Sequence, residues 1–297
     1  MKVLEQVLHS LMTRYIERVP DVLKITQALI EKGVIEKQED IENDHIAFRT
    51  MGVPNLGIAS FEKIFLHYGY TKKDSFFFER KKVKAYWYAP PSPEFPRIFL
   101  SELCVSDLSE EIGAIITSYT NEVTKDPVDN LDLNNAEEVS SFLQRPLWRI
   151  PTLDDYSKLL EASEYAGWVI YNRYYLNHYT ISVNELPKGY NTLTEFNTFL
   201  ESIGVVLSDA GGVIKSSKDG LLLQSASVSQ LCEATFADND TMKISGSYVE
   251  FAERKVLPEF TALPKNKIQR EHRREGFETA NADKIFESTF TSQTKRK

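Results

Sequence analysis

The sequence predicts an α+β fold, in which two β-α-β-β-β modules form a curved mixed sheet around a cleft, with helical layers added. One observation is a repeated order of segments: a strand-like segment containing a histidine, a helix ending at a glycine, and three further strand-like segments. The second is similar spacing in the two copies, 69 − 45 = 24 residues from His45 to Gly69 and 204 − 178 = 26 from His178 to Gly204. We therefore expect one integrated domain.

The first 105 residues contain a helical layer and the first module. Residues 1–43 are assigned to the helical layer, because apolar residues recur at helical spacing through residues 2–19. Pro20 ends that helix, and Asp21 is expected to cap a second helix that stops near Gly33. The first module spans 44–105. Its expected elements are strands at 44–50, 75–79, 83–89 and 97–105 and a helix at 58–69.

The rest of the chain repeats this order after an insertion. Residues 106–176 are expected to be mostly helical, and Thr152 with Asp155 resembles a capping box. The second module spans 177–254. Its expected elements are strands at 177–183, 213–215, 221–228 and 246–254 and a helix at 192–204. Residues 255–297 are charged but keep several phenylalanines, so we expect this C-terminal tail to dock on the body.

Composition excludes several classes of protein. The chain has no run of about 18 apolar residues, which argues against a membrane span. The formal net charge of −8 disfavours nucleic-acid binding, which needs a basic surface. The N-terminus is too polar for a signal peptide, so we expect a cytoplasmic protein, or a plastid protein if a transit peptide precedes this sequence. The sequence does not give the oligomeric state.

Histidines and glutamates at matching places in the two modules are the candidate metal ligands. Cys104 and Cys232 form no CxxC pair and are interpreted as packing residues, so a metal must use imidazole and carboxylate. His45 and His178 open the first strands, and Glu102 and Glu250 lie in the last strands. Such ligands suit Fe(II), Mn, Ni or Zn, and two histidines with one carboxylate form the facial triad of Fe(II) oxygen chemistry.

Two arginines share strand faces with these candidates. Side chains two residues apart point to the same face, so Arg49 is expected beside His45 and Arg254 beside Glu250. A guanidinium near a metal can hold a substrate carboxylate, and Arg49 is the better candidate, Arg254 the weaker. Arg49 could instead pair with Asp44 or Glu42 in a structural role. The other histidines are interpreted as structural or exposed: His9, His67 and His272.

Five segments together resemble the 2-oxoadipate dioxygenase/decarboxylase family, also called 2-hydroxyglutarate synthase: NDHIAFRT, RIFLSELCV, NHYTISV, GSYVEFAER and GFETANADKIFESTF. The resemblance covers roughly residues 40–105 and 175–290 and implies a fold related to the vicinal oxygen chelate superfamily. It places Fe(II) on His45, His178 and Glu250, and the substrate carboxylate on Arg49. Glu102 then becomes a residue near the ligands or a structural remnant. The implied partners are O2 and a small 2-oxo acid, 2-oxoadipate, which would yield 2-hydroxyglutarate and CO2.

Two other functions remain open on the sequence. One is a Zn- or Ni-dependent isomerase or lyase of the vicinal oxygen chelate type, with Glu102 as a fourth ligand. The other is a non-catalytic protein that binds a metal or a small molecule, against which the intact His45, His178 and Glu250 argue.

Overall fold

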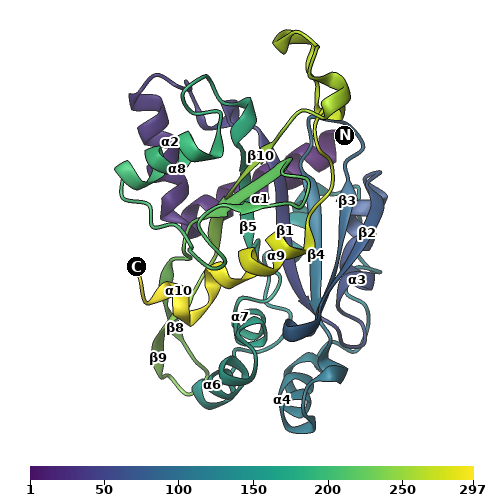
Figure 1. Ribbon diagram of the computed structural model, residues 1–297. Coiled ribbons are helices and arrows are strands. Elements are labelled where there is room, and N and C mark those ends of the chain that lie inside the picture. Colours follow the sequence, from purple (N-terminus) through teal and green to yellow (C-terminus); the bar gives the residue numbers. More distant parts are fainter.

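The computed structural model describes residues 1–297 and is built on one eight-stranded mixed sheet. The strand order is β2-β3-β4-β1-β5-β10-β7-β6, and Figure 1 shows the sheet curving through the centre of the molecule. The strands of the first half are β1 (Asn43–Met51), β2 (Thr71–Phe78), β3 (Val83–Ala89) and β4 (Arg97–Leu103). Those of the second half are β5 (His178–Ser182), β6 (Lys215–Ser216), β7 (Leu222–Ala226) and β10 (Tyr248–Arg254).

The two halves of the sheet have the same topology. In each half the first strand pairs in parallel with the last, β1 with β4 and β5 with β10, and the remaining strands are antiparallel. The helix after the first strand is α3 (Ile58–His67) in one half and α8 (Leu193–Ser202) in the other. The antiparallel pairing of β1 with β5 joins the halves at the centre. The α+β fold with a repeated module, predicted from the sequence, is therefore confirmed.

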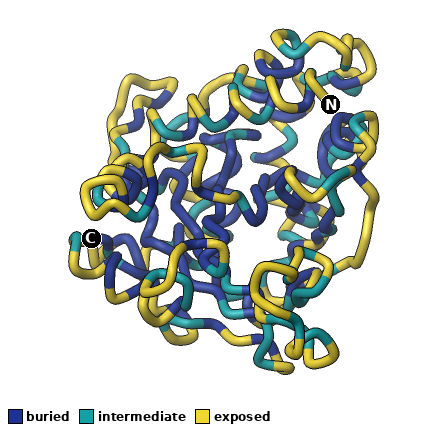
Figure 2. Tube along the Cα trace, turned by 90° about the horizontal axis from the view of Figure 1, so that it is seen from above, coloured by how far each residue is buried: buried dark blue, intermediate teal, exposed yellow.

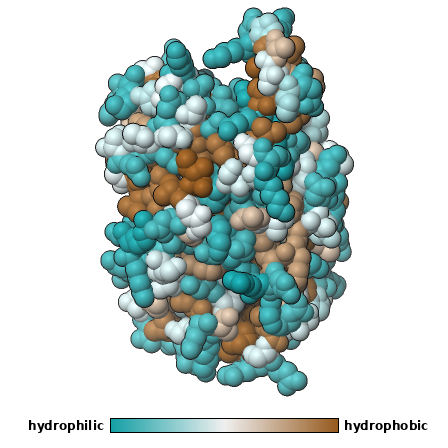
Figure 3. Space-filling view, viewed as in Figure 1, coloured by the Kyte–Doolittle hydropathy of each residue, from teal (hydrophilic) through white to brown (hydrophobic).

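Burial follows the position of each strand in the sheet. Eight of the nine residues of β1 are buried, as expected for a strand covered on both faces, whereas most of the edge strand β2 is exposed. In Figure 2 the buried trace occupies the middle of the molecule and the exposed trace surrounds it. Figure 3 shows apolar residues on one face as separate patches among hydrophilic ones. No helix has the length and apolar character needed to cross a membrane.

Helices cover the sheet and fill the insertion. The N-terminal pair is α1 (Lys2–Arg18) and α2 (Pro20–Glu31). The insertion contains α4 (Glu110–Thr120), α5 (Ala136–Phe142), α6 (Leu153–Ala162) and α7 (Glu164–Asn172). Pro20 begins α2 and Asp21 lies within its first turn, so the expected Asp21 cap is wrong: Val19 precedes the helix, and proline fits its first position.

Two further features differ from or extend the expected pattern. Along the chain, β7 and β10 are separated by an additional hairpin of β8 (Leu231–Thr235) and β9 (Thr241–Ser245), which forms a sheet of its own. The sequence pattern missed this hairpin. The C-terminal segment contains α9 (Thr279–Phe286) and α10 (Thr291–Thr294) and crosses the front of the sheet in Figure 1. Phe277 and Phe286 of this segment are buried in the main core, as their apolar character predicted.

Candidate metal centre

His45, His178 and Glu250 lie together in the centre of the sheet. Their ligand atoms are all within 4.8 Å of one another. Glu250 Oε2 is 3.1 Å from His178 Nε2 and 3.5 Å from His45 Nε2. All three side chains are buried, and they come from β5, β10 and β1, which are neighbours in the sheet. A set of two imidazoles and one carboxylate meeting at one point is suited to a divalent transition metal.

Strand register explains how residues so far apart in the sequence meet. His178 is opposite Ala47 of β1 and opposite Tyr248 of β10. Because side chains alternate along a strand, His45 shares the face of Ala47, and Glu250 shares the face of Tyr248. All of these residues line one internal cavity, together with Arg49. The sequence-based prediction that Arg49 lies on the same strand face as His45 agrees with this arrangement.

Hydrogen bonds at the far ring nitrogens orient both imidazoles. His45 Nδ1 lies 2.7 Å from Asp44 Oδ1, and His178 Nδ1 lies 3.1 Å from Asn177 Oδ1. These acceptors hold a proton on Nδ1 in each case, so Nε2 is the atom that faces Glu250 and can bind either a metal or a second proton. The Thr180 hydroxyl lies 3.1 Å from His45 Nε2, on the neighbouring strand β5. The tautomers therefore fit a cation bound between the two Nε2 atoms and the carboxylate.

Asp44 is itself held by two arginines. Arg254 donates to its two oxygens at 2.6 and 3.0 Å, and Arg97 donates at 3.2 Å. Burial alone would raise the pKa of the Asp44 carboxyl, but these arginines and His45 hold that pKa well below its usual value. Arg254 also donates to the carbonyls of residues 274 and 276 and does not line the cavity. The expectation that Arg254 binds substrate is therefore wrong, because its guanidinium is occupied by Asp44.

Glu250 is oriented from the second half of the sheet and from α9. Gln224 of β7 donates to Glu250 Oε1 at 2.6 Å, and Asn281 of α9 donates to Gln224 Oε1 at 3.0 Å. Burial raises the pKa of the Glu250 carboxyl, but His45 and His178, which donate to it from protonated Nε2 atoms when no metal is bound, outweigh burial and lower it. The carboxylate is thus ionised and fixed, and its Oε2 atom faces the two imidazoles.

Arg49 is a buried guanidinium with no carboxylate beside it. It donates to Thr289 Oγ1 at 3.0 Å and to the Phe286 carbonyl at 3.1 Å, while its Nε has no partner. The rings of Tyr165, Trp168 and Phe286 surround it at 5.2 to 5.3 Å. The alternative in which Arg49 pairs with Asp44 or Glu42 is not seen. An uncompensated buried charge on the wall of the cavity is a site for an anion.

Glu102 belongs to the other face of the sheet. It pairs with Thr50, whereas Ser101 pairs with Arg49 and lines the cavity. Its Oε2 accepts from the Ile58 backbone N–H at 2.6 Å, at the start of α3, and its Oε1 contacts Lys84 at 2.8 Å. Gly57 precedes α3 with φ +79°, and a Cβ there would lie 2.6 Å from Glu102 Oε2. The expectation of Glu102 beside the metal ligands is therefore wrong: this carboxylate caps α3.

The cavity between the candidate ligands and Arg49 is small and lies among buried side chains. Its volume is ≈ 20 Å³, enough for about one water molecule, and every residue that lines it is buried. The C-terminal segment forms one wall through Phe277, Ala282, Ile285 and Phe286. The Phe277 ring packs edge-on against His45, with centroids 4.8 Å apart. Phe277 and α9 therefore cover this side of the site.

Several residues of this centre were not found from the sequence. Asp44 and Asn177 immediately precede the two histidines, and this repeated polar-residue–histidine pair is a signal that could have found them. Gln224 and Asn281 carry no comparable signal, because their link to Glu250 depends on how β7, β10 and α9 pack.

Comparisons with known proteins agree on one family. A family model described as 2-oxoadipate dioxygenase/decarboxylase matches residues 7–263. A chloroplastic 2-oxoadipate dioxygenase/decarboxylase of Arabidopsis thaliana is 40% identical over 282 residues, covering 90% of this chain and 74% of the relative. A chloroplastic/amyloplastic 2-oxoadipate dioxygenase/decarboxylase of Oryza sativa subsp. japonica is 41% identical over 264 residues, covering 86% of this chain and 71% of the relative.

Among the solved structures, one from rice resembles nearly the whole chain. The hydroxyglutarate synthase of Oryza sativa, crystallised in complex with 2-oxoadipate, has a TM-score of 0.89 and 38% identity, and covers 98% of this chain and 93% of its own. The names of the two plant relatives place them in plastids. The expected cytoplasmic location is therefore wrong, and the relatives point to a plastid instead.

Proposed function

Because this chain belongs to the 2-oxoadipate dioxygenase/decarboxylase family, we propose that it converts 2-oxoadipate and O2 to 2-hydroxyglutarate and CO2, with Fe(II) bound by His45, His178 and Glu250. The chain is an oxidoreductase by its family. The atoms balance, since one O2 adds two oxygens while one carbon leaves as CO2. The observation that carries the proposal is a buried, unpaired Arg49 on the same cavity wall as the three candidate ligands.

The donor set supports a redox-active metal with open positions. Three protein ligands leave further coordination positions, and Fe(II), when bound, supplies the electrons that activate O2 and the Lewis acidity that binds a 2-oxo acid. Asp44 and Asn177 keep the Nε2 atoms of His45 and His178 directed at the metal position beside Glu250. Gln224 keeps the Glu250 carboxylate from rotating. These bonds hold the ligands in place before the metal arrives.

Arg49 is proposed to bind the distal carboxylate of the substrate. Its partners in this structure are a hydroxyl and a carbonyl, both weaker acceptors than a carboxylate. A dicarboxylic 2-oxo acid would exchange these bonds for a charge-assisted pair, and its keto-acid end would then face the metal ligands. Arg49 thus fixes the orientation of the substrate in the cavity.

Closure of the cavity gives α9 a role in the reaction. A space for about one water cannot hold a six-carbon diacid, so substrate entry requires the α9 wall to move. Once closed again, Phe277 and Phe286 exclude water from the reacting atoms.

The direct test uses protein loaded anaerobically with Fe(II), given 2-oxoadipate and then O2. CO2 and 2-hydroxyglutarate are expected in equal amounts. The His178→Gln variant should lose turnover, and His67→Gln, which changes a histidine far from the site, should keep it. If the protein turns over another 2-oxo acid but not 2-oxoadipate, the substrate assignment changes. If it shows no metal-dependent turnover with any 2-oxo acid, the proposal is wrong.

The rival isomerase or lyase with a fourth ligand at Glu102 has lost its structural basis, because that carboxylate caps α3 on the other face of the sheet.

A further inference from the structure

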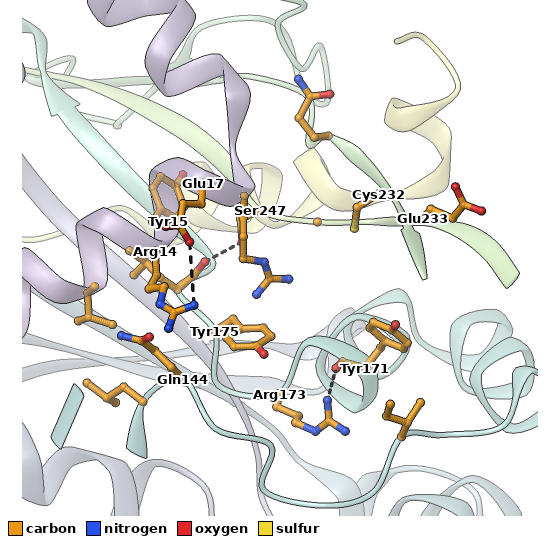
Figure 4. Close-up of a pocket in the computed structure, with 17 residues that line it drawn as sticks. Arg14, Tyr15, Glu17, Gln144, Tyr171, Arg173, Tyr175, Cys232, Glu233 and Ser247 are labelled. Atoms are coloured by element: carbon orange, nitrogen blue, oxygen red, sulfur yellow. Dashed lines mark hydrogen bonds and ion pairs between the residues drawn. The ribbon is translucent and has the colours of Figure 1, made fainter. Parts of the chain in front are cut away.

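A second pocket lies on the side of the sheet that α1 covers. Its volume is ≈ 610 Å³, within the range of small-molecule sites. Figure 4 shows its walls: α1 with Arg14 and Tyr15 on one side, the segment with Tyr171, Arg173 and Tyr175 on another, and β8 with Cys232 and Glu233 beyond. None of these residues takes part in the metal centre.

Three guanidinium groups line this pocket. Arg14 and Arg18 stand one turn apart on α1, and Arg173 follows the end of α7. Arg18 lies over the Tyr175 ring at 3.9 Å and donates to the Asn172 side chain at 3.1 Å. In Figure 4 the Tyr175 ring lies between Arg14 and Arg173. The pocket therefore has cationic groups on two walls and an aromatic surface between them.

These arginines lack close carboxylate partners. No carboxylate lies within 4.0 Å of Arg18 or Arg173, and Arg14 meets only Glu17, at 4.0 Å, with both side chains more than 60% exposed. Arg173 is 6% exposed, and its guanidinium donates only to the carbonyls of Trp148 and Tyr171. Glu17 and Glu233 also line the pocket, so the five charges leave it net positive. A buried, uncompensated guanidinium is costly unless an anion accompanies it.

The backbone at Arg173 supports the same interpretation. Its φ is +57°, a conformation that residues other than glycine rarely adopt. The fold keeps this strained conformation with the Arg173 side chain in the pocket wall, and strain of this kind is concentrated at functional sites.

We propose that this pocket binds a small organic anion, with its carboxylate or phosphate group beside Arg14 and Arg18 of α1, its carbon body against Tyr175, and Arg173 adding positive charge from the opposite wall. The site is separate from the metal centre. Tyr15 stands between them, since it lines the pocket and its hydroxyl donates to the Tyr248 carbonyl, while the Tyr248 ring lines the metal cavity. A ligand here would also contact Leu176 and Ser247, just before β5 and β10 begin.

The test is calorimetric titration of the metal-loaded protein with three probes of similar body: phenyl phosphate, benzoate and neutral benzyl alcohol. Saturable binding of at least one anion is expected, with benzyl alcohol at least tenfold weaker. Comparison of the two anions identifies the preferred head group, and binding of either supports the site. Equal binding of benzyl alcohol, or no saturable binding of either anion, would overturn the proposal.

Charge-removing variants locate the binding. Arg18→Gln is expected to weaken anion binding at least tenfold, and Arg14→Gln, on an exposed part of α1 where folding is not at risk, at least threefold. Arg145→Gln is the matched control, because Arg145 is exposed and does not line the pocket. If wild-type affinity persists in both the Arg18 and Arg14 variants, the anion binds elsewhere, for example at Arg49, and the proposal is wrong.

Discussion

Arg49 donates a hydrogen bond of 3.1 Å to the carbonyl of Phe286, so a buried guanidinium of β1 is tied to the last residue of α9. The same arginine is the proposed partner of the substrate's distal carboxylate. Carboxylate binding and the position of the C-terminal segment are therefore linked through one side chain, because the guanidinium exchanges the Phe286 carbonyl for the substrate.

The first prediction concerns this exchange. Arg49→Gln is expected to lower kcat/KM for 2-oxoadipate by on the order of 10²–10³-fold, because a buried charge-assisted pair is lost. With 2-oxohexanoate, which lacks the distal carboxylate, the variant and the wild type should differ by less than tenfold. Steady-state kinetics with both substrates checks this. An equal loss for both would mean that Arg49 acts on folding or on the metal rather than on the carboxylate.

The second prediction concerns the contact that holds α9 closed. Lys81 Nζ lies 2.7 Å from Asp283 Oδ1 and 3.1 Å from Glu287 Oε1, and its side chain is only 11% exposed. Lys81→Gln removes these ion pairs, worth about 1 kcal/mol together, so opening of α9 should become about fivefold more frequent. Hydrogen exchange of residues 279–286 measures this. Lys73→Gln, on the exposed strand β2, is the control, and equal exchange in both variants would contradict a latch at Lys81.

The third prediction concerns Asp44. Asp44→Asn keeps the shape of the side chain but leaves Arg97 and Arg254 buried without their carboxylate. The free energy of unfolding should therefore fall by about 3–5 kcal/mol. Metal affinity should also fall by about 10–100-fold, because His45 loses its charged acceptor. Denaturant unfolding and metal titration measure the two effects. Asp129→Asn, at an exposed ion pair, should change each only slightly, and similar losses in both variants would rule out this role for Asp44.

Much of this centre could be predicted from local pattern, and the rest depends on pairing between distant strands. The placement of His45 with Arg49 follows from alternation within one strand, which the sequence displays. The different roles of Glu250 and Glu102 cannot be predicted in this way, because both residues occupy the last strand of a module. The observed register pairs Glu102 with Thr50 and so turns it away from the cavity. The bonds from Arg254 to Asp44 and from Gln224 to Glu250 likewise exist only once β1, β10 and β7 are assembled.

The fourth prediction is a pH dependence of stability. Burial lowers the pKa of Lys215 to about 8, although Glu250 and other carboxylates oppose the shift, and its Nζ donates to the Ser208 carbonyl at 3.0 Å. Between pH 8 and about 10.5 the folded protein then binds fewer protons than the unfolded chain. As pH increases through this window, Lys215 therefore raises the free energy of unfolding, by up to about 3 kcal/mol. Denaturant unfolding across the window should show a smaller rise for Lys215→Met than for wild type. Identical curves would mean that Lys215 is not perturbed.

The fifth prediction separates two carboxylates that the sequence could not tell apart. Glu102→Gln should keep its full metal content, since Glu102 accepts from Ile58 at the start of α3 and contacts Lys84 rather than the imidazoles. It should lose about 1 kcal/mol of stability, because a negative charge at a helix N-terminus is removed. Glu250→Gln should instead lose metal, because its Oε2 faces both Nε2 atoms. Metal analysis of the two purified variants decides the matter. Metal loss in Glu102→Gln comparable to that in Glu250→Gln would restore a four-ligand site and, with it, the isomerase or lyase alternative.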